Sequence, residues 1–212
     1  MFKELFLTNN VSFISIPLDE SGIIIEELKK HNVNIAYVTP SHQFPTGTIM
    51  SISRRTELLN WANENFNCYI IEDDYDSEFK YTGRPIPALK ANDINDKVIY
   101  LGSFSKSISP AIRVSYLVLP KALLNIYQKK LPYFICPVPT LNQKILYKFI
   151  KDGYFVKHIN KMRTLYKKKR EFLVNTIKKY SSEIFNKEIY IQGADAGLHL
   201  SLIHISEPTR PY

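Results

Sequence analysis

The sequence predicts an α/β fold with a mainly parallel sheet and flanking helices. Short apolar runs rich in β-branched and aromatic residues alternate along the chain with longer segments of helical spacing. With 212 residues, 45% of them hydrophobic, the chain is long enough to bury a real core in one large domain. Strands that are separated by helices form βαβ units, which place their strands parallel to one another.

The first half of the chain contains two strand candidates and one helix. Residues 34–39 are a strand candidate that ends before Pro40, and residues 68–71 are the next. Between them a helix is predicted at 51–66, where apolar residues recur at helical spacing. A polar, proline-bearing loop follows from 74 to about 96.

The second half continues the alternation. Residues 98–101 are short, β-branched and aromatic, which is typical of a buried strand, and residues 114–119 form another strand that Pro120 closes. Helices are predicted at about 121–131, 139–151 and, much longer, 154–180, followed by strand-like segments at 188–191 and 197–200. The sequence contains no internal repeat.

Composition narrows the classes of protein. Cys68 and Cys136 lie far apart without metal-ligand spacing, so neither a zinc site nor a disulfide framework is indicated, and a reducing cytoplasm is expected. No stretch approaches the roughly 18 apolar residues of a membrane span, so we expect a soluble protein without a membrane partner.

The net charge of +8 is concentrated in one region. Residues 121–179 contain 15 Lys and Arg against Asp152 and Glu171, a local charge of +13. The lysines interrupt a helical pattern, which is typical of a solvated helix face. A surface that faces DNA or another acidic partner is the alternative.

Polar residues gather where three predicted strands end. The strands finish at Thr39-Pro-Ser-His-Gln, at Glu72-Asp-Asp-Tyr and at Ser103-Phe-Ser-Lys. Ligands bind beyond the carboxyl ends of strands in open α/β sheets, so these groups are expected to share a crevice. Lys106 is therefore predicted to be a site residue, although a lone lysine after a strand is usually a loop residue.

A lysine beside an aspartate in such a crevice suits one cofactor. A partly desolvated lysine has a lowered pKa and can attack a carbonyl to form a Schiff base. Pyridoxal phosphate uses such a lysine together with an acid at its ring nitrogen, a role that suits Asp73. Tyr75 can hydrogen-bond the ring oxygen, and Ser103, Ser105 and Arg113 supply donors and charge for the phosphate.

Four segments carry a family resemblance. "TPSHQFPTGT" (39–48), "IEDDYDSEFKY" (71–81), "GSFSKSISPAIRVSYLVLP" (102–120) and "GYFVKHINKMRTLYKKKREFL" (153–173) resemble, in that order, the aminotransferase-like domain of MocR-type regulators of the GntR superfamily. The resemblance covers roughly residues 11–200 and implies a fold-type-I pyridoxal-phosphate domain. Lys106 would then hold the cofactor as an internal aldimine, Asp73 would contact the pyridine nitrogen, Tyr75 the ring oxygen, and Ser103 and Arg113 the phosphate.

The sequence departs from ordinary aminotransferases at one place. They carry an asparagine directly before the Pro-Thr-Gly turn, where it meets the ring oxygen of the cofactor, but Phe44 stands there in this chain. His42 and Gln43, which precede it, are the candidates to replace that asparagine. The MocR-type proteins are more similar here, which favours a regulator.

The resemblance also predicts how the chain is divided and that it is truncated at both ends. Residues 1–153 are expected to be part of the large cofactor-binding domain, and residues 154–199 the long connecting helix with the start of the small domain. "LSLIHISEPTR" (200–210) resembles the translated sequence of a transposase adapter used for sequencing libraries. Residues 200–212 are therefore predicted to be a non-native tail, and Arg210 is not a candidate for substrate binding.

The sequence thus predicts a fragment of a MocR-type transcription regulator that binds pyridoxal phosphate. The intact protein would exchange the cofactor with an amine or amino acid, form a homodimer, and bind DNA through a winged-helix domain that precedes this chain. The first alternative is a class I/II aminotransferase in which Lys106 is also the general base. The second is a fragment without function whose exposed apolar faces make it aggregate.

Overall fold

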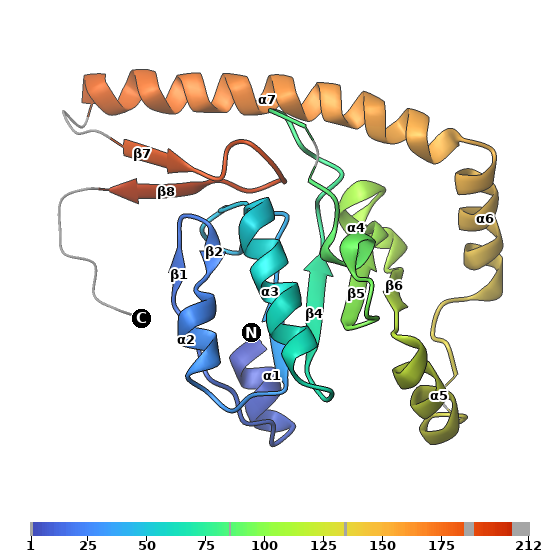
Figure 1. Cartoon of the computed structure of the whole chain (residues 1–212). Helices are drawn as coiled ribbons and strands as arrows, with labels where there is room; N and C mark the ends of the chain where they lie inside the picture. The colour runs from blue at the N-terminus through green and yellow to red at the C-terminus, as the bar shows by residue number, and fades with distance from the viewer. Residues whose placement is uncertain (1, 85, 134, 185–188, 205–212) are drawn as a thin grey trace.

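A four-stranded sheet is the centre of the computed structural model, which describes residues 2–84, 86–133, 135–184 and 189–204 (Figure 1). The strand order is β3 (Ile35–Val38), β4 (Tyr69–Asp74), β5 (Val98–Ser103) and β6 (Ser115–Val118). β3 and β5 both pair parallel with β4, whereas β6 is antiparallel to β5. The prediction of a mainly parallel sheet with flanking helices is confirmed.

The predicted helices are present. They are α3 (Ile52–Glu64), α5 (Lys121–Lys130), α6 (Thr140–Lys151) and α7 (Tyr154–Ile184). Ser51 caps α3, because its hydroxyl accepts the Arg54 amide at 3.3 Å. α7 continues to Ile184 rather than ending at 180, and it runs across one side of the molecule as a single long helix (Figure 1).

Several short elements were not predicted. They are α1 (Phe2–Thr8), the hairpin of β1 (Leu18–Asp19) and β2 (Gly22–Ile23), α2 (Ile25–Lys29), the 3-10 turns η1 (Leu89–Asn92) and η2 (Pro110–Ile112), and α4 (Phe104–Ser107). Each is too short to display a hydrophobic period, because one or two turns or two strand residues give too few repeats. α4 matters most, because it contains Lys106.

The core lies between one face of the sheet and helices α2 and α3. Leu58 and Ala62 of α3 pack with Ile70 of β4 and Val98 of β5, and all four side chains are buried. No helix in the described ranges has the length and apolar character that crossing a membrane requires.

A buried charge pair connects this core to the loop after β4. The Arg55 guanidinium donates to the carbonyl oxygens of Pro40 and Pro87, both at 2.9 Å, and lies 3.9 Å from the Glu72 carboxylate. Glu72 itself accepts the amides of Leu89 and Lys90 at 2.8 and 2.9 Å. The carboxylate is thus satisfied by main-chain donors as well as by the cation, as a buried charge requires.

Of the two strands predicted near the end of the chain, one is present and the other lies further along the sequence. β7 (Ile189–Gln192) agrees with the prediction, but the prediction of a strand at 197–200 is wrong, because β8 spans Ser201–His204 and pairs antiparallel with β7. The Gly197 amide donates to the Phe79 carbonyl at 2.6 Å, so this segment bonds to a distant loop instead. β8 lies within the segment that is predicted to be non-native, and residues 205–212, including Arg210, lie outside the described residues.

Truncating the core should lower stability much more than truncating the surface of the same helix. Leu58 is 0% exposed and Ile52 is 64% exposed. We expect Leu58→Ala to lower the free energy of unfolding by about 2–5 kcal/mol, because it leaves a cavity. Ile52→Ala should change it by less than about 0.5 kcal/mol. Urea unfolding of both variants measures the difference, and equal effects would contradict the assignment of the core.

Candidate functional site

The parallel register brings three strand ends to one edge of the sheet. Val38 pairs with Glu72, and Glu72 pairs with Tyr100. The three parallel strands β3, β4 and β5 are therefore in register near their carboxyl ends. The segments that follow carry the predicted site residues. The crevice predicted from the sequence therefore has its geometric basis in this register.

Alternation along β4 separates its consecutive acids. Glu72 and Asp74 are buried on the α3 side, whereas Asp73 points to the opposite face and is half-buried. The hydroxyl of Tyr37, from β3, donates to Oδ2 of Asp73. Burial raises the pKa of Asp73, the Tyr37 hydrogen bond opposes that rise, and the charges of Asp74 and Asp76 add to it.

Asp74 has a different environment from its neighbour. Its Oδ2 accepts the Tyr100 hydroxyl at 2.6 Å and the Ser77 hydroxyl at 2.8 Å. Its Oδ1 is buried and has no hydrogen-bond partner among the described residues. Asp74 thus belongs to the interior, and Asp73 is the acid that faces away from the core.

Lys106 follows β5 directly, within α4. The Ser103 hydroxyl caps this short helix by accepting the Ser105 amide at 3.2 Å. Lys106 is exposed. Its neighbour Ser107 is buried, and the Ser107 carbonyl lies 3.1 Å from Nε2 of His158 on α7. The long helix thus helps to fix the position of the segment that carries the amine.

Arg113 lies close to the start of α4 although it comes later in the chain. The Phe104 amide donates to the carbonyl of Val114 at 3.0 Å, and Ser103 pairs with Ser115. Arg113 is exposed and has the left-handed conformation, with φ of 49°. The backbone pairing therefore places Arg113 next to the start of α4, where Ser103 and Ser105 lie.

Tyr75, His42 and Gln43 make contacts within the protein. The Tyr75 hydroxyl donates to the main-chain carbonyl of His42 at 2.7 Å, and Nε2 of Gln43 donates to the Phe44 carbonyl at 3.4 Å. Nδ1 of His42 lies 3.0 Å from Oδ2 of Asp76, and both side chains are buried. The roles of these three residues toward a cofactor stay predictions.

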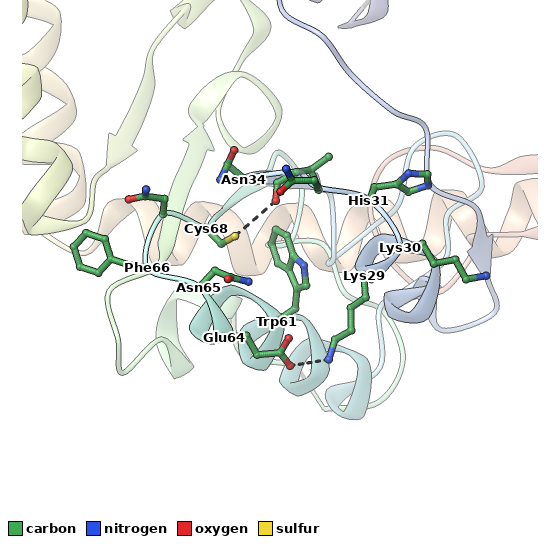
Figure 2. A pocket seen from close by; sticks show the side chains of 12 residues that line it. Lys29, Lys30, His31, Asn34, Trp61, Glu64, Asn65, Phe66 and Cys68 are labelled. Atoms are coloured by element: carbon green, nitrogen blue, oxygen red, sulfur yellow. Dashed lines mark hydrogen bonds and ion pairs between the residues drawn. The ribbon is translucent and has the colours of Figure 1, made fainter.

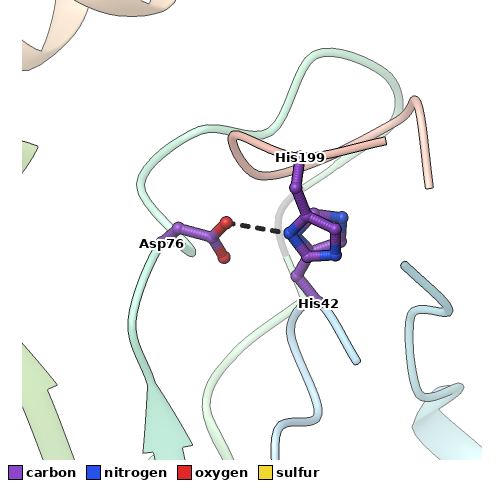
Figure 3. A group of neighbouring side chains, drawn as sticks. All are labelled: His42, Asp76 and His199. Atoms are coloured by element: carbon purple, nitrogen blue, oxygen red, sulfur yellow. Dashed lines mark hydrogen bonds and ion pairs between the residues drawn. The ribbon is translucent and has the colours of Figure 1, made fainter. Parts of the chain in front are cut away.

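A cluster of His42, Asp76 and His199 lies next to these residues (Figure 3). The two imidazoles stack with centroids 3.9 Å apart and planes at 32°. The pKa of His199 is lowered mainly by burial and further by the charges of His42 and Lys106, whereas the charge of Asp76 opposes this change. The sequence did not reveal Asp76 and His199 as partners of His42, because no spacing pattern links the three positions.

The cluster suits a hydrogen-bonded stack better than a metal centre. The ligating atoms of the three side chains lie within 4.8 Å of one another. The lone pair of an imidazole nitrogen lies in the plane of its ring, so two stacked rings direct their lone pairs past each other rather than toward one point. A tetrahedral ion would need both rings to turn out of the stack.

The segment 193–199 closes over this cluster by main-chain contacts. Leu198 donates its amide to Oδ2 of Asp76 at 3.0 Å, and Gly197 accepts the Tyr81 hydroxyl at 2.9 Å. Gly197 has φ of +68°, and a Cβ there would lie 1.8 Å from Nδ1 of His42. Only glycine fits so close to the buried pair.

A surface hollow of about 700 Å³ lies elsewhere, where the chain enters β3 and β4 (Figure 2). The Lys29 amine and the Glu64 carboxylate form an ion pair at 2.6 Å on its wall, and Trp61 and Cys68 line it as well. None of the predicted site residues lines this hollow. It is therefore separate from the carboxyl ends of β3, β4 and β5, where the sequence predicts the crevice.

Comparison with known proteins gives a consistent result. The family model described as aminotransferase class I and II matches residues 12–198. The chain is 44% identical to the uncharacterized HTH-type transcriptional regulator YdeL of Bacillus subtilis, over 94% of this chain and 42% of that protein. It is 31% identical to the probable rhizopine catabolism regulatory protein MocR of Rhizobium meliloti, over 92% of this chain and 38% of that protein.

Solved structures have the same fold. One is the kynurenine aminotransferase of Pyrococcus horikoshii, crystallised in complex with PMP. It superposes with a TM-score of 0.78 at 28% identity, over 90% of this chain and 48% of that chain. The chain thus spans less than half the length of the curated relatives and of this solved structure.

A side chain at position 197 should disrupt the buried cluster. Both Gly197 and Gly153 have positive φ, but a Cβ at 153 would meet nothing within 4 Å. We expect Gly197→Ala to lower the free energy of unfolding by at least about 2 kcal/mol more than Gly153→Ala, because only the former adds a clash to the backbone strain. Thermal and urea unfolding of the two variants test this. Equal losses would contradict the close packing of 193–199 on His42.

Proposed function

Because the chain belongs to the aminotransferase class I and II family, we propose that it is the pyridoxal-phosphate-binding part of a MocR-type transcription regulator, with the cofactor attached through Lys106. The observation that carries the proposal is the meeting of Asp73, Lys106 and the Ser103–Arg113 region at one edge of the sheet. These groups match the three polar features of the cofactor, which are a ring nitrogen, an aldehyde and a phosphate.

The donor set fits the cofactor chemically. Lys106 is exposed and follows β5, while Asp73 lies on the neighbouring strand and faces away from the core. The fold of a PMP-containing aminotransferase, at 28% identity, supports the same cofactor. When bound, pyridoxal phosphate supplies an aldehyde that reacts with amines and a ring that withdraws electrons from the resulting bond.

Each of the proposed site residues would have a defined role toward the cofactor. Lys106 would bind the aldehyde carbon through Nζ, and its amine would later accept or return a proton. Asp73 would accept a hydrogen bond from the protonated ring nitrogen, and Tyr75 would donate one to the ring oxygen. To do so, the Tyr75 hydroxyl must leave the His42 carbonyl that it now contacts.

The phosphate would be held by the segment around α4. The hydroxyls of Ser103 and Ser105 and the guanidinium of Arg113 are the donors in this region. Arg113 suits the task because its planar fork can bind two phosphate oxygens at once. Its exposure leaves the guanidinium accessible to a ligand.

The regulator assignment rests on the relatives. YdeL is named as a transcriptional regulator and MocR as a regulatory protein, and this chain matches about two fifths of each. We place a DNA-binding winged helix in the rest of the protein, a homodimer as its assembly, the cytoplasm as its location, and an amine or amino acid as its effector. A class I/II aminotransferase is the second candidate, and the likeness to the kynurenine aminotransferase favours it.

The upstream gene sequence separates the two candidates. Sequencing the genomic locus across Met1 should reveal a winged helix in the same frame. An aminotransferase arm there would overturn the regulator assignment and leave a catalytic protein. Sequencing past codon 200 tests the predicted non-native tail at the same time, because native sequence should diverge from "LSLIHISEPTR".

Replacing Lys106 should abolish covalent attachment of the cofactor. We expect the complete protein, incubated with pyridoxal phosphate and reduced with borohydride, to carry the cofactor mass on the Lys106 peptide. Lys106→Ala should lose the adduct and the visible absorption band, because the nucleophile is missing. Lys121→Ala, which removes a lysine at the start of α5, is the control. An adduct that survives in Lys106→Ala would sink the assignment.

Neutralising Asp73 should weaken cofactor binding without breaking the covalent link. Asp73→Asn keeps the shape of the side chain but removes the charge that stabilises a protonated ring nitrogen. We expect the dissociation constant for pyridoxal phosphate to rise at least about tenfold, because a charge-assisted hydrogen bond is lost. Equilibrium dialysis against the cofactor measures the change, and unchanged affinity would show that Asp73 is not the partner.

A further inference from the structure

We propose that Tyr37 is a positioning residue for cofactor binding. Its hydroxyl holds the Asp73 carboxylate in the charged form and oriented toward the ring nitrogen. The inference rests on the proposed function and adds to it a residue outside the predicted set. It starts from a contact between two neighbouring strands, the hydrogen bond from the Tyr37 hydroxyl to Oδ2 of Asp73.

The sheet register fixes this contact. Tyr37 pairs with Ile71, two residues before Asp73, and side chains two residues apart on a strand share a face. Tyr37 and Asp73 therefore project from the same face of the sheet, opposite the face that packs on α3. Backbone pairing keeps the phenol beside the carboxylate before any ligand arrives.

The carboxylate needs such a donor. Burial disfavours the charged form, and the carboxylates of Asp74 and Asp76 act in the same direction, so all three raise the pKa of Asp73. The hydrogen bond from Tyr37 lowers this pKa. A partner for a pyridinium must be ionised, and Tyr37 supplies the stabilisation that the surroundings oppose.

Tyr37 suits the task because it stays neutral. Burial, followed by the hydrogen bond and the charge of Asp73, raises the pKa of Tyr37 far above the ordinary value of a phenol. The phenol therefore remains a proton donor over the whole physiological range. A lysine or arginine in its place would satisfy the carboxylate charge and compete with the pyridinium for it.

The contact also orients the acid. Tyr37 donates to Oδ2 of Asp73, and no other described side chain donates to this carboxylate. One oxygen of the carboxylate is thus tied to the sheet, and the other is left for the ring nitrogen. A carboxylate held at one oxygen loses less rotational freedom when the cofactor binds.

The chain offers a matched control one residue away. Tyr100 donates to Oδ2 of Asp74 at 2.6 Å, so the same two residue types form the same contact on the opposite face of β4. Tyr37→Phe and Tyr100→Phe each remove one phenol hydroxyl that is bonded to one aspartate. Only the former removes it from the acid assigned to the cofactor.

The experiment uses the complete protein loaded with pyridoxal phosphate labelled with ¹⁵N in the ring. In Tyr37→Phe the ¹⁵N signal should move toward the value of an unprotonated pyridine, because the pKa of Asp73 rises and the carboxylate supports the pyridinium less. The dissociation constant for the cofactor should rise about tenfold, in line with loss of a hydrogen bond to a charged group. Tyr100→Phe should leave the ¹⁵N signal at the wild-type position.

A double-mutant cycle distinguishes an effect that Tyr37 exerts through Asp73 from a general structural effect of the substitution. Added to Asp73→Asn, the Tyr37→Phe change should produce no further loss of cofactor affinity, because the two residues act through one contact. Independent, additive losses, or a ¹⁵N signal in Tyr37→Phe that stays at the wild-type position, would overturn the inference. If wild-type protein instead gives no Lys106 adduct after borohydride, the proposed function itself fails, which is a distinguishable result.

Discussion

The register of β4 between its two parallel neighbours is the constraint on which the site depends. Three consecutive acids lie on this strand, and because successive side chains point to opposite faces, Asp73 is separated from Glu72 and Asp74. Glu72 accepts main-chain amides of the 89–90 turn, Asp74 accepts Tyr100, and Asp73 accepts Tyr37. A slip of one residue would exchange the faces, placing Asp73 against α3 and Glu72 in the crevice. The site therefore inherits its geometry from the hydrogen-bond ladder of the sheet.

Neutral groups donate the hydrogen bonds that hold these three carboxylates in place. Among the described residues, the ion pair on these three acids is that of Glu72 with Arg55, and at 3.9 Å it lies outside direct hydrogen-bond range. Tyrosine hydroxyls and backbone amides serve Asp73, Asp74 and Glu72 instead. Neutral donors satisfy the oxygens without cancelling the negative charge, so the strand end keeps an electrostatic potential that favours a cationic ring. Seven lysines lie along α7, away from this strand end, and all seven are exposed.

The sequence predicts the sheet, the long helices and the ends of the strands, because these depend on patterns that repeat over many residues. It predicts that Asp73 and Lys106 follow neighbouring strand ends for the same reason, and the parallel register of β4 and β5 agrees with this. It misses Tyr37, Asp76 and His199, whose importance depends on which face of a strand they occupy or on contacts across more than a hundred residues. It also misplaces the strand after 197, because Gly197 and Leu198 bond to the loop that follows β4.

The closure of 193–199 over the His42–Asp76 pair has a consequence for biosynthesis. The contact between Leu198 and Asp76 spans 122 residues, and the contact between His42 and Gly193 spans 151. A ribosome adding roughly 5–20 residues per second releases the later partner several seconds after the earlier one. During that interval His42 and Asp76 lack the main-chain partners that residues 193–199 provide. The buried pair therefore acquires its last partners only after all four strands of the central sheet have been synthesised.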